Sequence, residues 1–179
     1  MRQLTFAACV LATAAAADEA PLTLTSDLNR DSAYETFLLT PGEDGTYDLR
    51  IDTARGQEIV APGFVWAGAM AGQMPGLALA ANGSVQVISM NDSVGRDRWR
   101  QVLTIVYRKG AYQVAGFTYG WHDTLDAANY GDCDVNLLTG RGEATHAGVI
   151  RTFRTRAHAV PVTRWADDPQ VPPECGIAP

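Results

Sequence analysis

Short runs of alternating apolar and polar residues, separated by turn-forming residues, dominate the chain beyond its first 20 positions. Residues 34–40 are rich in β-forming side chains, and residues 46–52 place Tyr47, Leu49 and Ile51 at alternate positions. Residues 41–45 between them are a cluster of proline, glycine and acidic residues, which is typical of a turn. The pattern therefore predicts an antiparallel hairpin over residues 34–52.

Two further hairpins are predicted downstream. Residues 77–80 and 85–89 flank Asn82 and Gly83, a dipeptide that favours a two-residue turn with positive φ at both positions. Residues 99–108 and 111–121 flank Lys109 and Gly110 and form the longest predicted pair. Strict alternation in the second arm places Tyr112, Val114, Gly116 and Thr118 on one face and Gln113, Ala115, Phe117, Tyr119 and Trp121 on the other. Because both faces carry apolar residues, a central strand covered on both sides is expected.

One more strand is predicted near residues 149–160, with Pro161 ending it. Residues 63–76, which mix glycines with Trp66, Met70 and Met74, are interpreted as a loop or short strand on the core. No stretch keeps an apolar period of about 3.6 residues, so little helix is expected. The predicted fold is all-β or mainly β, an antiparallel sandwich or partly closed sheet built from hairpins.

Length and charge narrow the classes of function. A chain of 179 residues suits one domain with a hydrophobic core of its own. The formal net charge of −6 disfavours nucleic acid as a partner, because phosphate binding needs a basic surface. No apolar stretch approaches the length of a membrane-spanning helix.

The N-terminus has the pattern of a cleaved secretory signal peptide, predicted over residues 1–17. Arg2 precedes an apolar stretch, which is followed by alanines 14–17 and then by Asp18 and Glu19. A membrane anchor is the alternative, and the apolar stretch is too short for one. The remaining residues 18–179 are predicted to form a single exported β domain, periplasmic or secreted.

Removal of the leader also removes Cys9 and leaves Cys133 and Cys175. An even pair of cysteines in an oxidising compartment predicts a disulfide, which would tie the proline-rich C-terminal tail back onto the domain. Two free thiols are the alternative, and no CxxC pattern or nearby histidine supports a metal site there.

The sharpest local pattern is an acidic loop, residues 27–35, in which Asp27, Asn29 and Asp31 alternate and Glu35 closes the set. Alternating oxygen-bearing side chains are the arrangement with which protein loops bind calcium. Ser32 occupies the sixth position, where calcium loops usually carry glycine, and Leu38 occupies the twelfth, where an EF-hand carries glutamate. The alternative is a structural turn in which the carboxylates bind local backbone amides.

The pattern D-x-N-x-D-x-x-x-E followed by an apolar strand resembles the FG-GAP/VCBS-type repeat of bacterial exported proteins. Residues 98–99, 103–119 and 133–141 are similar to a family of small uncharacterised bacterial exported proteins. These proteins share a strand–Gly–aromatic hairpin and an Asn-Leu-Leu-Thr-Gly-Arg type of segment. The resemblance implies calcium binding at Asp27, Asn29, Asp31 and Glu35, and it implies no known activity.

Two surface groups are candidate ligand sites. If Trp121, His122 and Tyr130 are exposed together, they would mark a carbohydrate-binding or peptide-binding surface. Arg154 and Arg156 are expected on one face of a strand, where they would bind an anionic partner. The alternative for the arginines is a solvated sheet face with neighbouring acids.

The predicted function is that of an exported, non-enzymatic binding or structural domain with one candidate Ca²⁺ site. Its predicted partner is a protein, peptide or glycan of the cell envelope. The sequence contains no nucleophile elbow, no HExxH zinc motif and no phosphate-binding glycine loop. A small periplasmic hydrolase whose active site forms from scattered residues stays open as the alternative.

Overall fold

The computed structural model describes residues 22–177. The predicted signal peptide, residues 1–17, lies outside the described residues. Two short 3₁₀ turns accompany twelve strands in the described part of the chain. The strands are β1 (Thr23–Ser26), β2 (Glu35–Pro41), β3 (Thr46–Asp52), β4 (Glu58–Trp66), β5 (Gly76–Leu79), β6 (Val85–Asn91), β7 (Asp97–Arg108), β8 (Ala111–Asp123), β9 (Tyr130–Asn136), β10 (Arg141–His146), β11 (Val149–Arg154) and β12 (Val160–Pro161). The turns are η1 (Val162–Arg164) and η2 (Pro173–Cys175).

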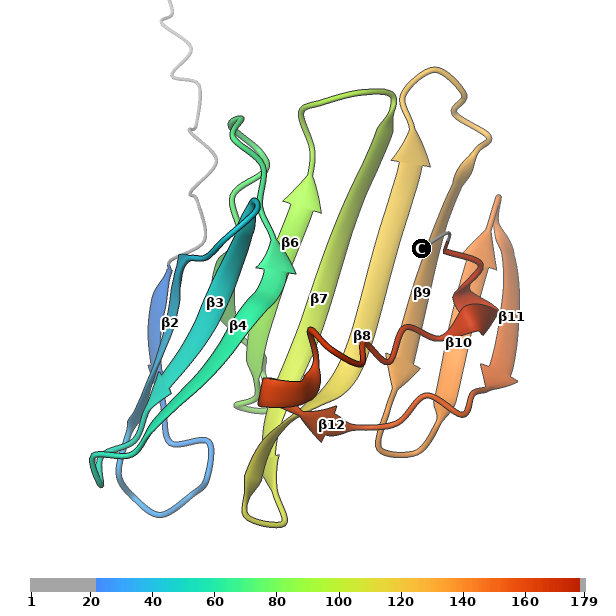
Figure 1. The fold of residues 1–179 in the computed structure, drawn as a ribbon. Coiled ribbons are helices and arrows are strands. Elements are labelled where there is room, and N and C mark those ends of the chain that lie inside the picture. The colour runs from blue at the N-terminus through green and yellow to red at the C-terminus, as the bar shows by residue number, and fades with distance from the viewer. Residues whose placement is uncertain (1–21, 178–179) are drawn as a thin grey trace, which may run out of the picture.

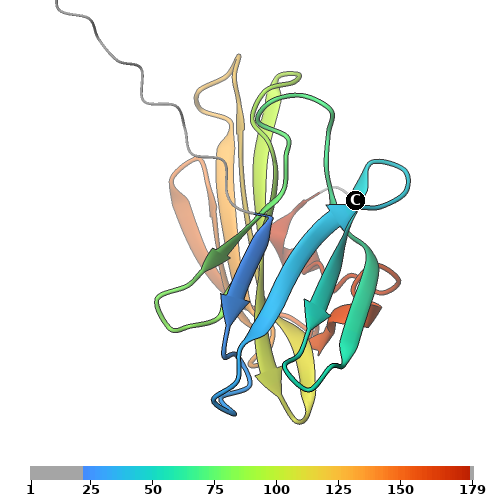
Figure 2. The same ribbon diagram turned by 90° about the vertical axis from the view of Figure 1, so that its left-hand side faces the viewer.

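The strands form two antiparallel sheets that pack face to face (Figures 1 and 2). The smaller sheet has the order β1-β2-β3-β4. The larger has the order β11-β10-β9-β8-β7-β6-β5, and β12 pairs with β8 in addition. The prediction of an all-β sandwich is confirmed.

The hydrophobic core lies between the two sheets. Phe37, Leu49 and Ile51 of the small sheet and Leu103 and Phe117 of the large sheet belong to one buried cluster. We call the face of the large sheet that carries Leu103 and Phe117 its inner face, and the opposite face its outer face. Burial of such side chains supplies most of the free energy that holds two sheets together.

The three predicted hairpins are present. The first pairs β2 with β3, the second β5 with β6 and the third β7 with β8. In the third, Lys109 and Gly110 both take positive φ, 53° and 78°, as the right-handed twist of a two-residue hairpin requires. In the second, the predicted turn is wrong: only Gly83 has positive φ. The Gly83 N–H donates to the Ala80 carbonyl at 2.8 Å, so the reversal is a longer loop in which glycine alone is left-handed.

The predicted facing of β8 is also wrong, because the strand contains a bulge. Thr104 pairs with Gly116 and Ile105 with Val114, so one residue of β8, Ala115, has no partner on β7. The extra residue shifts the alternation. Tyr112 and Val114 therefore contribute to the same core as Phe117 and Tyr119. Apolar residues on both predicted faces thus reflect the bulge, and not a strand covered on two sides.

The predicted strand over residues 149–160 is shorter than expected. It ends at Arg154, and the chain then runs irregularly to the two-residue strand β12. Within residues 63–76, the first four residues belong to β4 and residues 67–75 form a loop to β5.

The C-terminal segment folds back across the inner face of the large sheet, in front of β8 to β10 in Figure 1. Trp165, 4% exposed, packs on Phe117 with ring centroids 6.5 Å apart. The structure contains the predicted disulfide between Cys133 and Cys175, with Cα atoms 5.6 Å apart. Within residues 22–177, no helix has the length and apolar character to cross a membrane.

Candidate functional site

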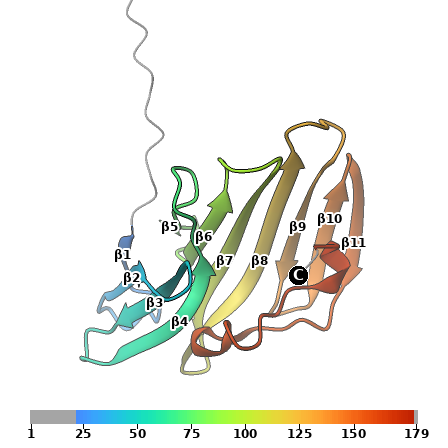
Figure 3. The same ribbon diagram turned by 45° about the horizontal axis from the view of Figure 1, so that its top comes forward.

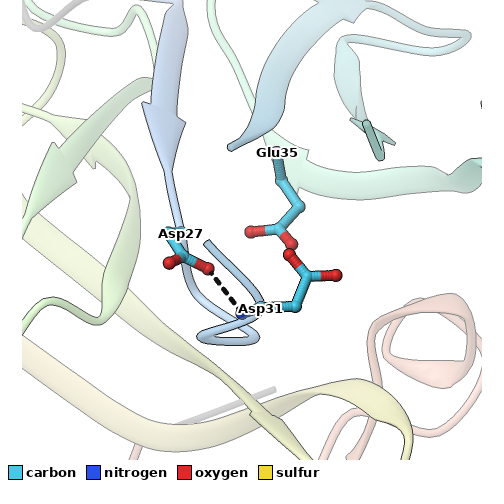
Figure 4. Close-up of side chains that lie close together, drawn as sticks. All are labelled: Asp27, Asp31 and Glu35. Carbon is cyan, nitrogen blue, oxygen red and sulfur yellow. Dashed lines mark hydrogen bonds between the residues drawn. The ribbon is translucent and has the colours of Figure 1, made fainter. Parts of the chain in front are cut away.

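The acidic loop joins β1 to β2 at one end of the sandwich. One carboxylate oxygen each from Asp27, Asp31 and Glu35 lie within 4.8 Å of one another. Figure 4 shows the Asp31 and Glu35 carboxylates turned toward each other. The sequence spacing thus brings the three acids together in space, as the calcium-loop interpretation requires.

Hydrogen bonds inside the loop hold this arrangement. Asp27 accepts the Asp31 N–H at Oδ1 (3.0 Å) and the Ser32 N–H at Oδ2 (3.1 Å). Asn29 Oδ1 also accepts the Asp31 N–H, at 2.8 Å, and Asp31 Oδ1 accepts the Ala33 N–H at 3.0 Å. These are Asx-type hydrogen bonds, which are also typical of a purely structural turn. They preorganise the loop under either interpretation.

The sixth loop position adopts the backbone conformation of a calcium loop although it is serine and not glycine. Ser32 has a φ of 69°, and Arg30 has a φ of 61°. The loop therefore makes with serine the left-handed turn for which a glycine is usually needed. This conformation costs about 1 kcal/mol or more for a residue with a side chain.

Glu35 is the unusual member of the set, because its side chain is 1% exposed. Its Oε2 accepts the Leu28 N–H at 2.8 Å. Tyr112, 5% exposed, lies beside it, and its ring packs edge-on against Phe37 with centroids 6.1 Å apart. Burial raises the pKa of Tyr112, and the neighbouring Glu35 carboxylate raises that pKa further. The Tyr112 hydroxyl therefore stays protonated at neutral pH and can act as a hydrogen-bond donor.

Asn29, Asp31 and Glu35 line one side of a pocket of about 410 Å³. The turn between β3 and β4 contributes Arg55 and Gln57 to its wall, and β7 and β8 contribute Tyr107 and Tyr112. An Nη2 atom of Arg55 lies 3.3 Å from Asp31 Oδ2. The Arg55 side chain is 82% exposed, so this ion pair contributes little stability.

A second charged cluster centres on Asp123, which is 4% exposed at the end of β8. Asp123 accepts hydrogen bonds from the Arg96 guanidinium and, at 2.9 Å, from the Leu125 N–H. Arg96, followed by the Leu125 N–H, holds the pKa of Asp123 well below its usual range. The cluster fixes the loop before β7 to the loop after β8. His122 takes no part in it, as expected for neighbours on a strand.

The residues of the predicted ligand surface lie on opposite faces of the large sheet. Trp121 pairs across the strands with Trp99, which contacts Trp66 of the small sheet, so Trp121 lies on the inner face. His122 and Tyr130 pair with each other on the outer face. The condition for that surface, exposure of the three residues together, is therefore not met.

Arg154 and Arg156, the two arginines predicted to bind an anionic partner, lie apart from these aromatic residues. Arg154 pairs with Arg141 at the end of β11, on the outer face among Asp134 and Glu143. Arg156 lies beyond the end of the strand, so the two arginines do not share a strand face as predicted. The acids beside Arg154 agree with the alternative of a solvated sheet face.

Sequence reasoning missed the residues that accompany Trp121. Its ring lies 5.4 Å from that of His146 on β10. Across the same face, Trp99 lies 5.3 Å from Trp66 and 6.0 Å from Tyr119, centroid to centroid. The register of β7 against β8 could have placed Trp99 beside Trp121, but the positions of Trp66 and His146 depend on long-range pairing.

No protein-family model, curated protein or solved structure matches this chain. The resemblance to calcium-binding repeats of exported proteins therefore stays a prediction, and the geometry of the site is what supports a function.

Proposed function

We propose that this chain is an exported, non-enzymatic binding or structural β domain that holds one calcium ion in the acidic loop. The observation that carries the proposal is the convergence of three carboxylates within 4.8 Å, one of them on a side chain that is 1% exposed. Asp27, Asn29, Asp31 and Glu35 would supply the ligand oxygens. Calcium prefers such hard oxygen donors in flexible geometry, typically about 6–8 of them.

Electrostatics supports a cation at this position. Two like unit charges about 4 Å apart repel by about 1 kcal/mol in water and about 4 kcal/mol near a protein surface. Three carboxylates carry a formal charge of −3, and one largely exposed guanidinium, that of Arg55, offsets part of it. A divalent cation would remove the repulsion and would compensate the burial of Glu35.

The enzyme alternative receives less support from the pocket. A hydrolase that uses Tyr112 as a base would need a lowered pKa, and burial raises it. Among the described residues, the pocket wall contains no histidine or cysteine that could pair with a nucleophile. We therefore favour binding over catalysis at this site.

Export is supported by the disulfide as well as by the predicted leader. Disulfides persist in oxidising compartments and are rare in the cytosol. The proposed location is periplasmic or extracellular, and the proposed partner is a protein, peptide or glycan of the cell envelope.

Thermal unfolding tests the calcium proposal. A ligand that binds the native state at 100 times its Kd stabilises it by about 2.7 kcal/mol. For a domain of this size, that corresponds to a rise in Tm of about 5–10 °C. The rise should disappear with a chelator and in the Asp31→Ala and Glu35→Gln variants. It should persist in Asp132→Ala, which removes an exposed carboxylate from β9. An unchanged Tm at millimolar calcium would leave the acidic loop as a structural turn.

A further inference from the structure

Three of the four tryptophans of the chain lie on one surface with Tyr119 and His146. We call the set Trp66, Trp99, Tyr119, Trp121 and His146 the aromatic platform. It crosses the structure from β4 through β7 and β8 to β10. The Trp99 and Tyr119 rings are nearly parallel, at an interplanar angle of 15°.

Gly131 allows the Trp121 ring to lie close against the sheet. A Cβ atom at position 131 would approach Trp121 Nε1 to 2.9 Å and Cε2 to 3.0 Å, so any larger residue would displace the indole. Gly131 is the direct cross-strand partner of Trp121, and His146 is the partner of Gly131 on β10. The indole therefore rests over the glycine, with His146 beside it.

The platform stays accessible in the described part of the chain. The C-terminal segment crosses the inner face first toward the lower ends of the strands and then rises past η2 in front of β9 (Figures 1 and 3). Trp66 is 39% exposed, and Trp99, Tyr119 and Trp121 are partly exposed. By contrast, the fourth tryptophan, Trp165, is 4% exposed against Phe117. Core packing therefore accounts for Trp165 and in part for Tyr119, but the three platform tryptophans do not belong to the core cluster.

The charges around the platform speak against an anionic partner. Arg96 is paired with Asp123, and Arg151 donates from Nη2 to the Glu174 carbonyl at 2.6 Å while its guanidinium lies over Phe153. Burial raises the pKa of Tyr119, and the charge of Asp97 raises it further, so a negative potential reaches the platform. An anionic ligand is disfavoured there.

We propose that the aromatic platform binds a neutral glycan chain, whose sugar rings place their apolar C–H faces on the indole rings. Aromatic side chains with one solvent-exposed edge suit a ligand that is apolar on its faces and polar on its rim. The platform spans three strand spacings from β7 to β10, about 14 Å, which exceeds one sugar ring. The inference rests on the proposed role as a binding domain and names the class of its partner. It does not require calcium.

Intrinsic tryptophan fluorescence of the purified protein measures this binding, because three tryptophans lie at the site and Trp165 gives a constant background. The probes are cellohexaose, chitohexaose and maltohexaose, each titrated separately to millimolar concentration with and without a chelator. At least one should shift the emission saturably. Trp121→Ala should weaken that Kd about tenfold or more, the factor for losing one stacking contact of about 1.4 kcal/mol.

His122→Ala is the matched control, because His122 neighbours Trp121 in sequence and lies on the opposite face. It should leave the Kd unchanged, and circular dichroism checks that both variants fold. The proposal is overturned if none of the three glycans shifts the emission, or if Trp121→Ala binds like the wild type. A saturable response only to a proline-rich peptide would assign the platform to a peptide instead. Loss of the calcium response with glycan binding intact would refute only the metal site.

Discussion

The disulfide between Cys133 and Cys175 offers the clearest stability prediction. The two cysteines are separated by 42 residues in sequence, and the crosslink closes a loop of that size in the unfolded chain. In the chain-entropy account, a loop of this length restricts the unfolded state by about 4 kcal/mol. The Cys133→Ala/Cys175→Ala variant should therefore lose about 4 kcal/mol, equivalent to about 8–16 °C in Tm for a domain of this size.

Urea denaturation followed by circular dichroism at 25 °C is the appropriate assay. The variant should unfold at lower urea, and its m-value should rise because the uncrosslinked unfolded chain exposes more surface. Wild-type protein in dithiothreitol should unfold with the variant, which controls for the small cavity left at Cys133.

A loss below about 1 kcal/mol would contradict an entropic role for the disulfide, since it is far less than loop-closure entropy predicts. It would mean that other contacts already order the C-terminal segment in both states. Two such contacts are the packing of Trp165 on Phe117 and the hydrogen bond from Arg151 to the Glu174 carbonyl.

Three substitutions elsewhere, one of them with a matched control, test a turn, the core and an ion pair. Gly110→Ala should cost about 1 kcal/mol in urea denaturation because φ is 78° there, whereas Gly120→Ala, with ordinary φ and open space, should be near neutral. Phe37→Ala, at a fully buried position, should cost about 3–5 kcal/mol by the same assay. Arg96 lowers the pKa of Asp123, so the stability that Asp123 adds is present above the usual aspartate pKa of about 4 and is lost as pH falls through its lower folded value. The Tm deficit of Asp123→Asn should therefore be constant near neutral pH and shrink in acid; a deficit that grows in acid would contradict this.

The hairpins could be predicted from the sequence because their signals are local. Turn residues such as Lys109 and Gly110 lie between runs of matching alternation, and the register follows from the turn. The bulge at Ala115 could not be predicted in this way. Nothing in the alternation marks one extra residue, and the bulge reverses the facing of every position beyond it.

The two candidate sites also differ in how far local sequence patterns predict them. The acidic loop lies within nine consecutive residues, so its spacing already implied the convergence of Asp27, Asp31 and Glu35. The burial of Glu35 beside Tyr112 depends on how the two sheets pack, and no local pattern encodes it. The aromatic platform likewise joins residues from four strands. Sequence neighbours of Trp121 were poor guides to it, because adjacent residues on a strand point to opposite faces.

Isothermal titration of calcium into chelator-treated protein measures calcium binding at the acidic loop. One ion per chain should bind saturably to the wild type and to Asp132→Ala, and none should bind to Asp31→Ala. Absence of binding in the wild type at millimolar calcium would rule out a calcium site in the acidic loop, as would binding that survives in Asp31→Ala with the same stoichiometry and affinity.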